Sequence, residues 1–172
     1  ATLLDAYRQG ISIPNLDEAW AGMVREAERM PLKTPDQCLE ASVDYWALGQ
    51  LAQETGREDE ALWWTQRGEQ VFDSVWTKEF MIIDSTYTRM RGNGLYQGTR
   101  WQYRWGAPMY LKRMEQLVGS KVLLAQLEQF FQEELYSQGN EPDIHVPLLF
   151  GGPGAPEKTA PVVRSLATEV VT

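Results

Sequence analysis

The sequence predicts an all-α fold built from paired antiparallel helices. Apolar residues recur at helical spacing along most of the chain, Gly or Pro interrupts them at intervals of about one helix, and only residues 80–83 have the character of a strand. A chain of 172 residues with 43% hydrophobic residues can bury one real core, which favours a single domain. Helices paired in this way form a bundle, a helical solenoid or a piece of an (α/α) toroid.

Four helices are expected in the first half of the chain, each bounded by a residue that favours a helix end. Gly10 stops the first helix, and Gly56 separates the third from the fourth. Residues 31–36 are expected to form a loop. The expected helices are 1–9, a second from an Asn15 or Asp17 cap to just before Pro31, 38–55 and 58–76.

The second half is less regular. Residues 80–83 are predicted to form a short strand or an extended segment, and Gly92-Asn93-Gly94 a turn. The remaining expected helices are one from about Thr99 that bends near Pro108, one over 120–136, and one over 155–168 with Pro156 in its first turn.

Composition excludes several classes of function. A formal net charge of -8 argues against a nucleic-acid partner, which would need clustered Lys and Arg. With one cysteine, Cys38, and one histidine, His145, the chain has no internal disulfide, no thiolate metal cluster and no two-His zinc site. No run approaches eighteen apolar residues, so no membrane association is expected. Seven Trp and seven Tyr indicate either an aromatic core or rings that grip sugars or bases, and composition leaves both open.

Three short motifs carry a resemblance to a known family. They are L-Y-Q-G-T-R-W-Q-Y-R-W at 95–105, G-N-E-P-D-I-H-V-P-L-L-F at 139–150 and G-A-P-E-K-T at 154–159. In order and separation they resemble glycoside hydrolase family 92, whose members are exo-acting, calcium-dependent, inverting α-mannosidases. The D-Y-W at 44–46 and the helix after it are also similar to the family.

The resemblance implies a larger protein than this chain. The family's catalytic domain is an (α/α)6 toroid paired with a β-sandwich, so residues 1–172 are expected to be a partial catalytic domain, with the sandwich upstream. The family's catalytic base lies in a motif beyond Thr172. The chain alone is therefore expected to be inactive, its partners being the rest of its own catalytic domain and a mannose-containing glycan. The family also implies a secreted or periplasmic location.

Gln97 stands where the family has its general acid. An inverting glycosidase uses a carboxylic acid and a carboxylate base about 6.5 to 9.5 Å apart. An amide cannot donate a titrating proton, so a sugar alkoxide leaving group would lose about 10² to 10⁴ in rate. A phosphate leaving group, with its last pKa near about 6, needs no such help. The resemblance therefore implies hydrolysis of mannose-1-phospho-6-mannose. The alternatives are an ordinary α-1,2-mannosidase and a non-catalytic helical-repeat binding module.

Basic and aromatic residues close to Gln97 are the expected substrate contacts. Arg100 and Arg104 follow Gln97 by one and almost two helical turns, and Arg91 precedes the turn. A guanidinium fork suits phosphate, although pairing of these arginines with surface carboxylates is the alternative. Trp101 is the expected sugar-facing ring.

The G-N-E-P segment is the expected metal site. Asn140 and Glu141 supply an amide carbonyl and a carboxylate from adjacent residues, and the resemblance implies that both bind calcium. Without the resemblance they are only polar residues in a turn. Asp143 and His145 follow on the same loop, which lines the sugar site in the family, so both are expected to contact substrate. The alternative for His145 is a structural role.

Overall fold

The computed structural model describes residues 1–83 and 94–169 and confirms the all-α fold. Within these ranges no β-strand forms, apart from an isolated bridge residue at Leu95. The chain divides into two compact units, Ala1–Val75 and Trp76–Thr172. The expectation of one partial catalytic domain over residues 1–172 stays a prediction. No helix in the described part of the chain has the length and hydropathy needed to cross a membrane.

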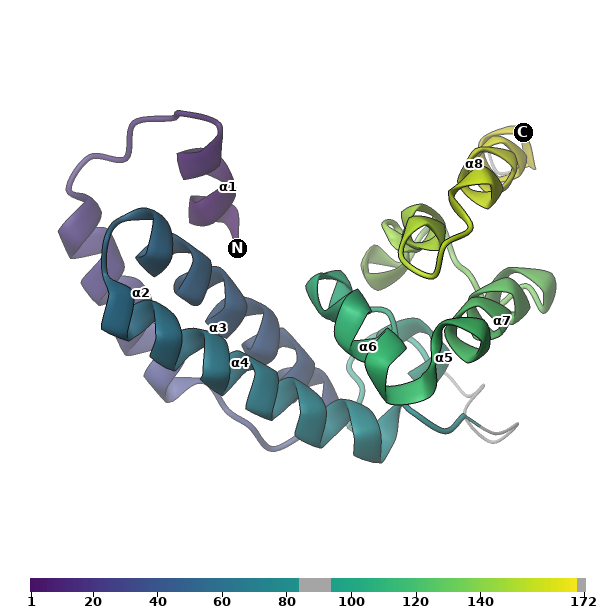
Figure 1. Ribbon diagram of the computed structural model, residues 1–172, viewed down its shortest axis with the longest axis horizontal. Helices are drawn as coiled ribbons and strands as arrows, with labels where there is room; N and C mark the ends of the chain where they lie inside the picture. The colour runs from purple at the N-terminus through teal and green to yellow at the C-terminus, as the bar shows by residue number, and fades with distance from the viewer. Residues whose placement is uncertain (84–93, 170–172) are drawn as a thin grey trace. The chain divides into compact units, whose positions relative to one another are not determined.

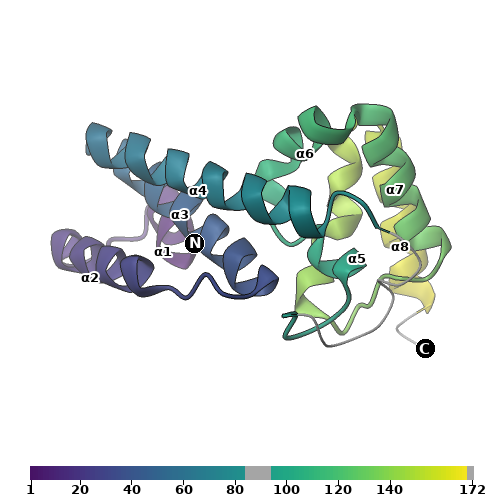
Figure 2. The ribbon, with the colours of Figure 1, turned by 90° about the horizontal axis from the view of Figure 1, so that it is seen from below.

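Antiparallel helices form the first unit. Figures 1 and 2 show α3 and α4 side by side, joined by a short turn at Gly56, whose φ of +77° lies in the left-handed region. The buried core of the first unit includes Trp20, Leu51 and Trp64. The helices that begin in this unit are α1 (Thr2–Arg8), α2 (Leu16–Arg29), α3 (Pro35–Glu54) and α4 (Glu58–Glu79), the last of which continues into the second unit.

Helix α3 begins three residues earlier than expected from the sequence. Thr34 is its N-cap and Pro35 occupies the first turn, where the missing N–H of proline costs little. The carboxylate of Asp36 then accepts a hydrogen bond of 2.7 Å from the backbone N–H of Gln37. The assignment of residues 31–36 to a loop is therefore wrong at its last two positions, because Pro35 is accommodated in the first turn of α3.

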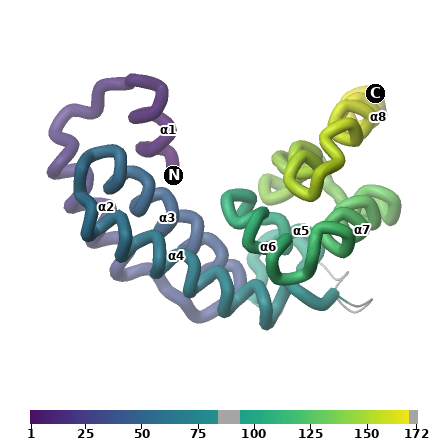
Figure 3. Tube along the Cα trace, viewed as in Figure 1, coloured from purple at the N-terminus to yellow at the C-terminus, as the bar shows by residue number. Residues whose placement is uncertain are grey.

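The second unit is made of shorter helices, several of them 3-10 turns. The chain turns sharply between α6 and α7, where Gly119 has a φ of +85° (Figure 3). Its elements after α4 are α5 (Arg100–Tyr103), η2 (Pro108–Tyr110), α6 (Leu111–Val118), α7 (Ser120–Gln132), η3 (Glu141–Asp143), η4 (Val146–Gly151), η5 (Pro156–Lys158) and α8 (Thr159–Glu169).

Two sequence expectations for this unit need correction. The helix expected to start at Thr99 does not bend near Pro108, because α5 already ends at Tyr103; Pro108 begins a separate 3-10 turn, where its missing N–H costs little. Helix α7 ends at Gln132 instead of Tyr136, and Glu134 beyond it has a φ of +54°.

The segment 80–83 follows α4 without forming a strand. Phe80 is fully buried while Ile82 is 73% exposed, so the apolar run does not lie on one buried surface. In the turn expected next, Gly94 has a φ of +79°, while Gly92 and Asn93 lie outside the described residues.

Candidate active site

A tight turn presents Gln97 at the start of α5. Gly98 has a φ of +100°, a conformation that favours glycine. Thr99 then caps the helix in a reciprocal capping box: its backbone N–H donates to Gln102 Oε1 (2.8 Å), and Gln102 N donates to Thr99 Oγ1 (3.3 Å). The backbone N–H of Gln97 donates to the Tyr103 hydroxyl (3.2 Å), and the residue itself is exposed. The backbone is thus held by α5 while Gln97 faces solvent.

The second motif is anchored by a buried carboxylate. Asp143, at the end of η3, is fully buried, and its Oδ2 accepts hydrogen bonds from Gln102 Nε2 (2.7 Å) and from the backbone N–H of Ser137 (2.8 Å). Gln102 lies 41 residues earlier in the sequence. The side-chain amide of Gln102 therefore links the two motifs, because its Oε1 is bonded to Thr99 in the first and its Nε2 to Asp143 in the second.

The two turns also lie in direct contact at Gly98. A Cβ placed on Gly98 would lie 2.6 Å from Gln102 Oε1 and 2.9 Å from Asn140 Nδ2, both too short for real contacts. The turn that carries Gln97 therefore lies against Asn140, which precedes Glu141 on η3. Glu141 is exposed, so an exposed amide and an exposed carboxylate flank this contact.

Burial sets the ionisation of Asp143. It raises the pKa of this carboxyl to about 6, although the hydrogen bonds from Gln102 and Ser137 and the nearby amide of Asn140 act in the opposite direction. Asp143 Oδ1 and Asn140 Nδ2 are both buried and neither makes a hydrogen bond of normal geometry. The Asn140 amide therefore lowers the pKa of Asp143 from close by, without a hydrogen bond of normal geometry.

His145 is tied to the backbone of the first motif. Its Nε2 lies 2.8 Å from the carbonyl oxygen of Trp105. Because a carbonyl can only accept, Nε2 carries the proton and Nδ1 of the neutral ring is an acceptor. Burial lowers the pKa of His145, and the hydrogen bond to Trp105 opposes this shift. The structure therefore favours a structural role, and contact of His145 with substrate stays a prediction.

Arg104 lies inside the second unit and not on a surface. It is fully buried, with its guanidinium over the rings of Trp76 (4.7 Å) and Trp105 (5.3 Å). It donates to the carbonyl oxygens of Phe80 and Met81 and to Gln126 Oε1. Burial lowers its pKa to about 9, which still leaves it protonated at neutral pH. This position disfavours the predicted contact with a substrate phosphate.

The other two residues expected around Gln97 are also largely enclosed. Arg100 forms an ion pair of 2.7 Å with Glu79, both side chains being mostly buried, and so pairs with a carboxylate that is not on the surface. Trp101 is only 4% exposed, which disfavours a sugar-facing ring and assigns it to the core. Substrate contact by either residue stays a prediction. Arg91 lies outside the described residues.

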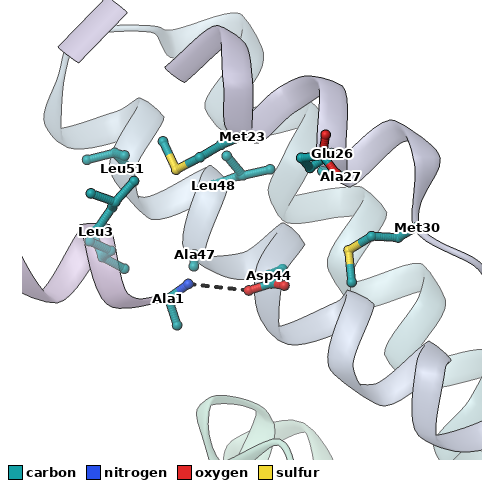
Figure 4. Close-up of a pocket in the computed structure, with 11 residues that line it drawn as sticks. Ala1, Leu3, Met23, Glu26, Ala27, Met30, Asp44, Ala47, Leu48 and Leu51 are labelled. Atoms are coloured by element: carbon teal, nitrogen blue, oxygen red, sulfur yellow. Dashed lines mark hydrogen bonds and ion pairs between the residues drawn. The ribbon is translucent and has the colours of Figure 1, made fainter. Parts of the chain in front are cut away.

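A separate cavity lies in the first unit, away from these motifs in the sequence. It has a volume of about 260 Å³ and lies among α1, α2 and α3. Figure 4 shows Met23, Leu48 and Leu51 around it, with the N-terminal ammonium group of Ala1 paired to Asp44 at 3.3 Å. None of the predicted site residues lines it. Its lining is mostly apolar and offers few groups for chemistry.

Comparison with known families decides the assignment. Residues 34–171 match the profile described as glycosyl hydrolase family 92 catalytic domain, a stretch that contains both motifs. The chain belongs to glycosyl hydrolase family 92. A search of curated proteins gave no match. Family 92 membership makes this a glycoside hydrolase of the mannosidase type, with a glycan as its substrate class.

One residue of the candidate site was not among the expected substrate contacts. The side chain of Gln102 joins the two motifs through hydrogen bonds to Thr99 and Asp143. The sequence does indicate the bond between Gln102 and Thr99, because the spacing of these two residues is that of a capping box. Nothing in the sequence indicates its second partner, Asp143.

Proposed function

We propose that this family 92 enzyme removes terminal α-mannose with inversion from mannose-1-phospho-6-mannose, with a phosphate as the leaving group. The observation that supports this is the exposed amide of Gln97, on a turn packed against Asn140 of the second motif. Gln97 can donate a hydrogen bond to a phosphate oxygen without bringing a negative charge next to it. The proposed location is secreted or periplasmic.

Calcium is the proposed cofactor, held by Asn140 and Glu141. The donor set fits in kind, since an amide oxygen and a carboxylate are hard ligands on adjacent residues and Glu141 is exposed. The number of ligands is too small, because calcium takes about six to eight oxygens. The described residues contain no cluster of three acidic, His or Cys groups that could hold a metal. Sugar hydroxyls and water would complete the set. When bound, the ion would supply positive charge at the sugar being cleaved.

The arginines contribute to this proposal unequally. Arg100, three residues after Gln97, stays a proposed phosphate contact, but its Nη1 is already engaged by Glu79. Arg104 is fully buried, so we do not include it among the phosphate contacts. Gln97 therefore carries the proposed specificity.

The test is a comparison of two substrates with the full-length gene product. Wild-type enzyme is expected to cleave a mannose-1-phospho-6-mannose glycan much faster than α-1,2-mannobiose. Gln97→Glu should slow cleavage of the phosphodiester by placing a carboxylate beside an anion, and should raise hydrolysis of the disaccharide by restoring an acid. That gain falls short of the full general-acid effect of about 10² to 10⁴, because Arg100 favours the ionised carboxylate.

A matched control is Gln116→Glu, which makes the same change of charge at an exposed position on α6. It should leave both rates unchanged. Equal rates on the two substrates in wild type, with no response to Gln97→Glu, would show that Gln97 is not at the leaving group. Fast cleavage of the disaccharide alone would establish the ordinary α-1,2-mannosidase instead.

A further inference from the structure

We infer that Gln102 is a positioning residue that sets the placement of Gln97 relative to the Asn140–Glu141 turn. This inference rests on the proposed function, in which Gln97 faces the leaving group and the Asn140–Glu141 turn holds the metal. Gln102 itself is only 4% exposed and does not face the substrate. It acts through the backbone of one motif and the carboxylate of the other.

Both ends of the Gln102 amide are used, and each end needs its own chemistry. Oε1 accepts from the backbone N–H of Thr99 (2.8 Å), which follows Gln97 and Gly98 directly. Nε2 donates to Asp143 Oδ2 (2.7 Å). Only a side chain with an acceptor and a donor at this length can make both bonds; an ionised Glu lacks the donor, and Met offers neither group at full strength.

Asp143 is a suitable fixed point for this link. It is fully buried, and the same Oδ2 also accepts from the backbone N–H of Ser137 (2.8 Å), just before the G-N-E-P segment. A buried carboxylate with two donors is strongly held, because losing either donor leaves a desolvated charge poorly paired. The backbone of the metal-binding turn is thereby pinned at both of its ends.

Close packing at Gly98 fixes the position of the Gln97 turn relative to the Asn140–Glu141 turn. A Cβ at this residue would meet both Gln102 Oε1 (2.6 Å) and Asn140 Nδ2 (2.9 Å), so the Gln97 turn has no free space between α5 and the second motif. Loss of the Gln102 link would let the two turns separate. A displacement of about 1 Å is enough to cost a large factor in rate, since reacting groups must be held in register.

Gln102→Glu is the sharpest test, since it is isosteric and keeps the acceptor for Thr99 while replacing the donor to Asp143 with an oxygen. In the full-length gene product we expect kcat on mannose-1-phospho-6-mannose and the calcium affinity each to fall by about 10- to 100-fold, as for other residues that support ligands indirectly. KM should change much less, because Gln102 does not touch substrate. Calcium affinity is measured by titration calorimetry, without turnover.

Variants of Asp143 provide the reciprocal test. Asp143→Leu removes both hydrogen bonds and should lose at least as much as Gln102→Glu, whereas Asp143→Asn keeps an acceptor for Gln102 and Ser137 and should lose less. The double variant Gln102→Glu/Asp143→Leu should be no worse than Asp143→Leu alone, since both changes break the same link between Gln102 and Asp143. Gln116→Glu on α6 serves as the control for charge, and thermal unfolding of each variant checks the fold.

Hydrogen exchange separates the link from the activity. Gln102→Glu should speed amide exchange in the Asn140–Glu141 segment, and Asp143→Leu should speed it around Thr99. If exchange, kcat and calcium affinity of a folded Gln102→Glu protein equal those of wild type, the inference is wrong. If wild type cleaves neither mannoside, the proposed function fails instead, and the exchange comparison still shows whether Gln102 couples the two turns.

Discussion

Buried polar side chains concentrate where the two motifs meet. Gln102, Asp143 and Arg104 are each at most 4% exposed, and each is held by several hydrogen bonds. Removing such groups from water is costly unless they find partners in the protein. Much of the polar content of these motifs therefore serves to fix the backbone, while Gln97 and Glu141 remain exposed for binding.

We predict that adding a single methyl group at Gly98 lowers the free energy of unfolding substantially. Gly98→Ala must adopt a φ of +100° and place its Cβ 2.6 Å from Gln102 Oε1. Gly119→Ala is the matched control, because it also has a positive φ (+85°) but meets nothing within 4 Å. The control should lower the free energy of unfolding by about 1–3 kcal/mol, and Gly98→Ala by about 1–3 kcal/mol more. Urea unfolding of the 172-residue chain measures the stability of both variants. Equal decreases in the free energy of unfolding would show that the close contact at Gly98 does not affect stability.

His145 should make stability depend on pH. Its pKa is lowered in the folded state, so the unfolded chain takes up a proton first as the pH falls through about 6.5. The contribution of His145 to the free energy of unfolding is therefore greatest above that pH and decreases as the pH falls through its folded-state pKa. His145→Gln keeps an N–H donor for Trp105 without a titrating group, and should remove this decrease. The measurement is the difference between the two proteins in urea unfolding at about pH 7.5 and about pH 5; a constant difference would contradict it.

At the scale of elements, close helix packing depends on Gly49 of α3. A Cβ there would lie 2.5 Å from Thr65 Oγ1 and 3.0 Å from the backbone nitrogen of Thr65 on α4. The backbone atom cannot move aside, so the helices would have to separate along their length.

We predict opposite effects for two Gly→Ala changes in helices. Gly22→Ala on α2, whose nearest neighbour would be Arg25 Nη2 at 3.8 Å, should raise the free energy of unfolding by up to about 1 kcal/mol through helix propensity. Gly49→Ala gains the same helix propensity but should lower the free energy of unfolding by about 1–3 kcal/mol because of overpacking. Thermal or urea unfolding distinguishes them. Stabilisation by Gly49→Ala would mean that α3 and α4 do not approach as closely as described.

At the scale of the whole molecule, the proposed calcium ion should couple stability to activity. Excess chelator is expected to abolish hydrolysis by the full-length gene product, and calcium to restore it. Calcium at about 100 times its dissociation constant should add about 2.7 kcal/mol to the stability of the native state. Glu141→Gln should weaken this effect through loss of one charge from a hard oxygen site, while Glu133→Gln, an exposed carboxylate beyond α7, should not. Activity that persists in chelator would remove calcium from the proposal.

Local sequence determined the class of fold and the family. Gly and Pro punctuation predicted most helix boundaries, because helix ends depend on the φ of one residue or the missing N–H of another. The error at Pro35 arose because a proline can stop a helix or start one, and its neighbours in space decide which. The family followed from short motifs that the profile match bears out over residues 34–171.

Tertiary structure alone decided which polar residues of those motifs face outward. Helix α5 is only four residues long, too short for periodicity to define its buried side, so Trp101 could not be told from a surface residue. Arg104 is buried because Trp76, Trp105 and the carbonyl oxygens after α4 enclose it. The bond between Gln102 and Asp143 spans 41 residues. A contact between distant segments depends on how the intervening helices pack, and no local pattern in the sequence records it.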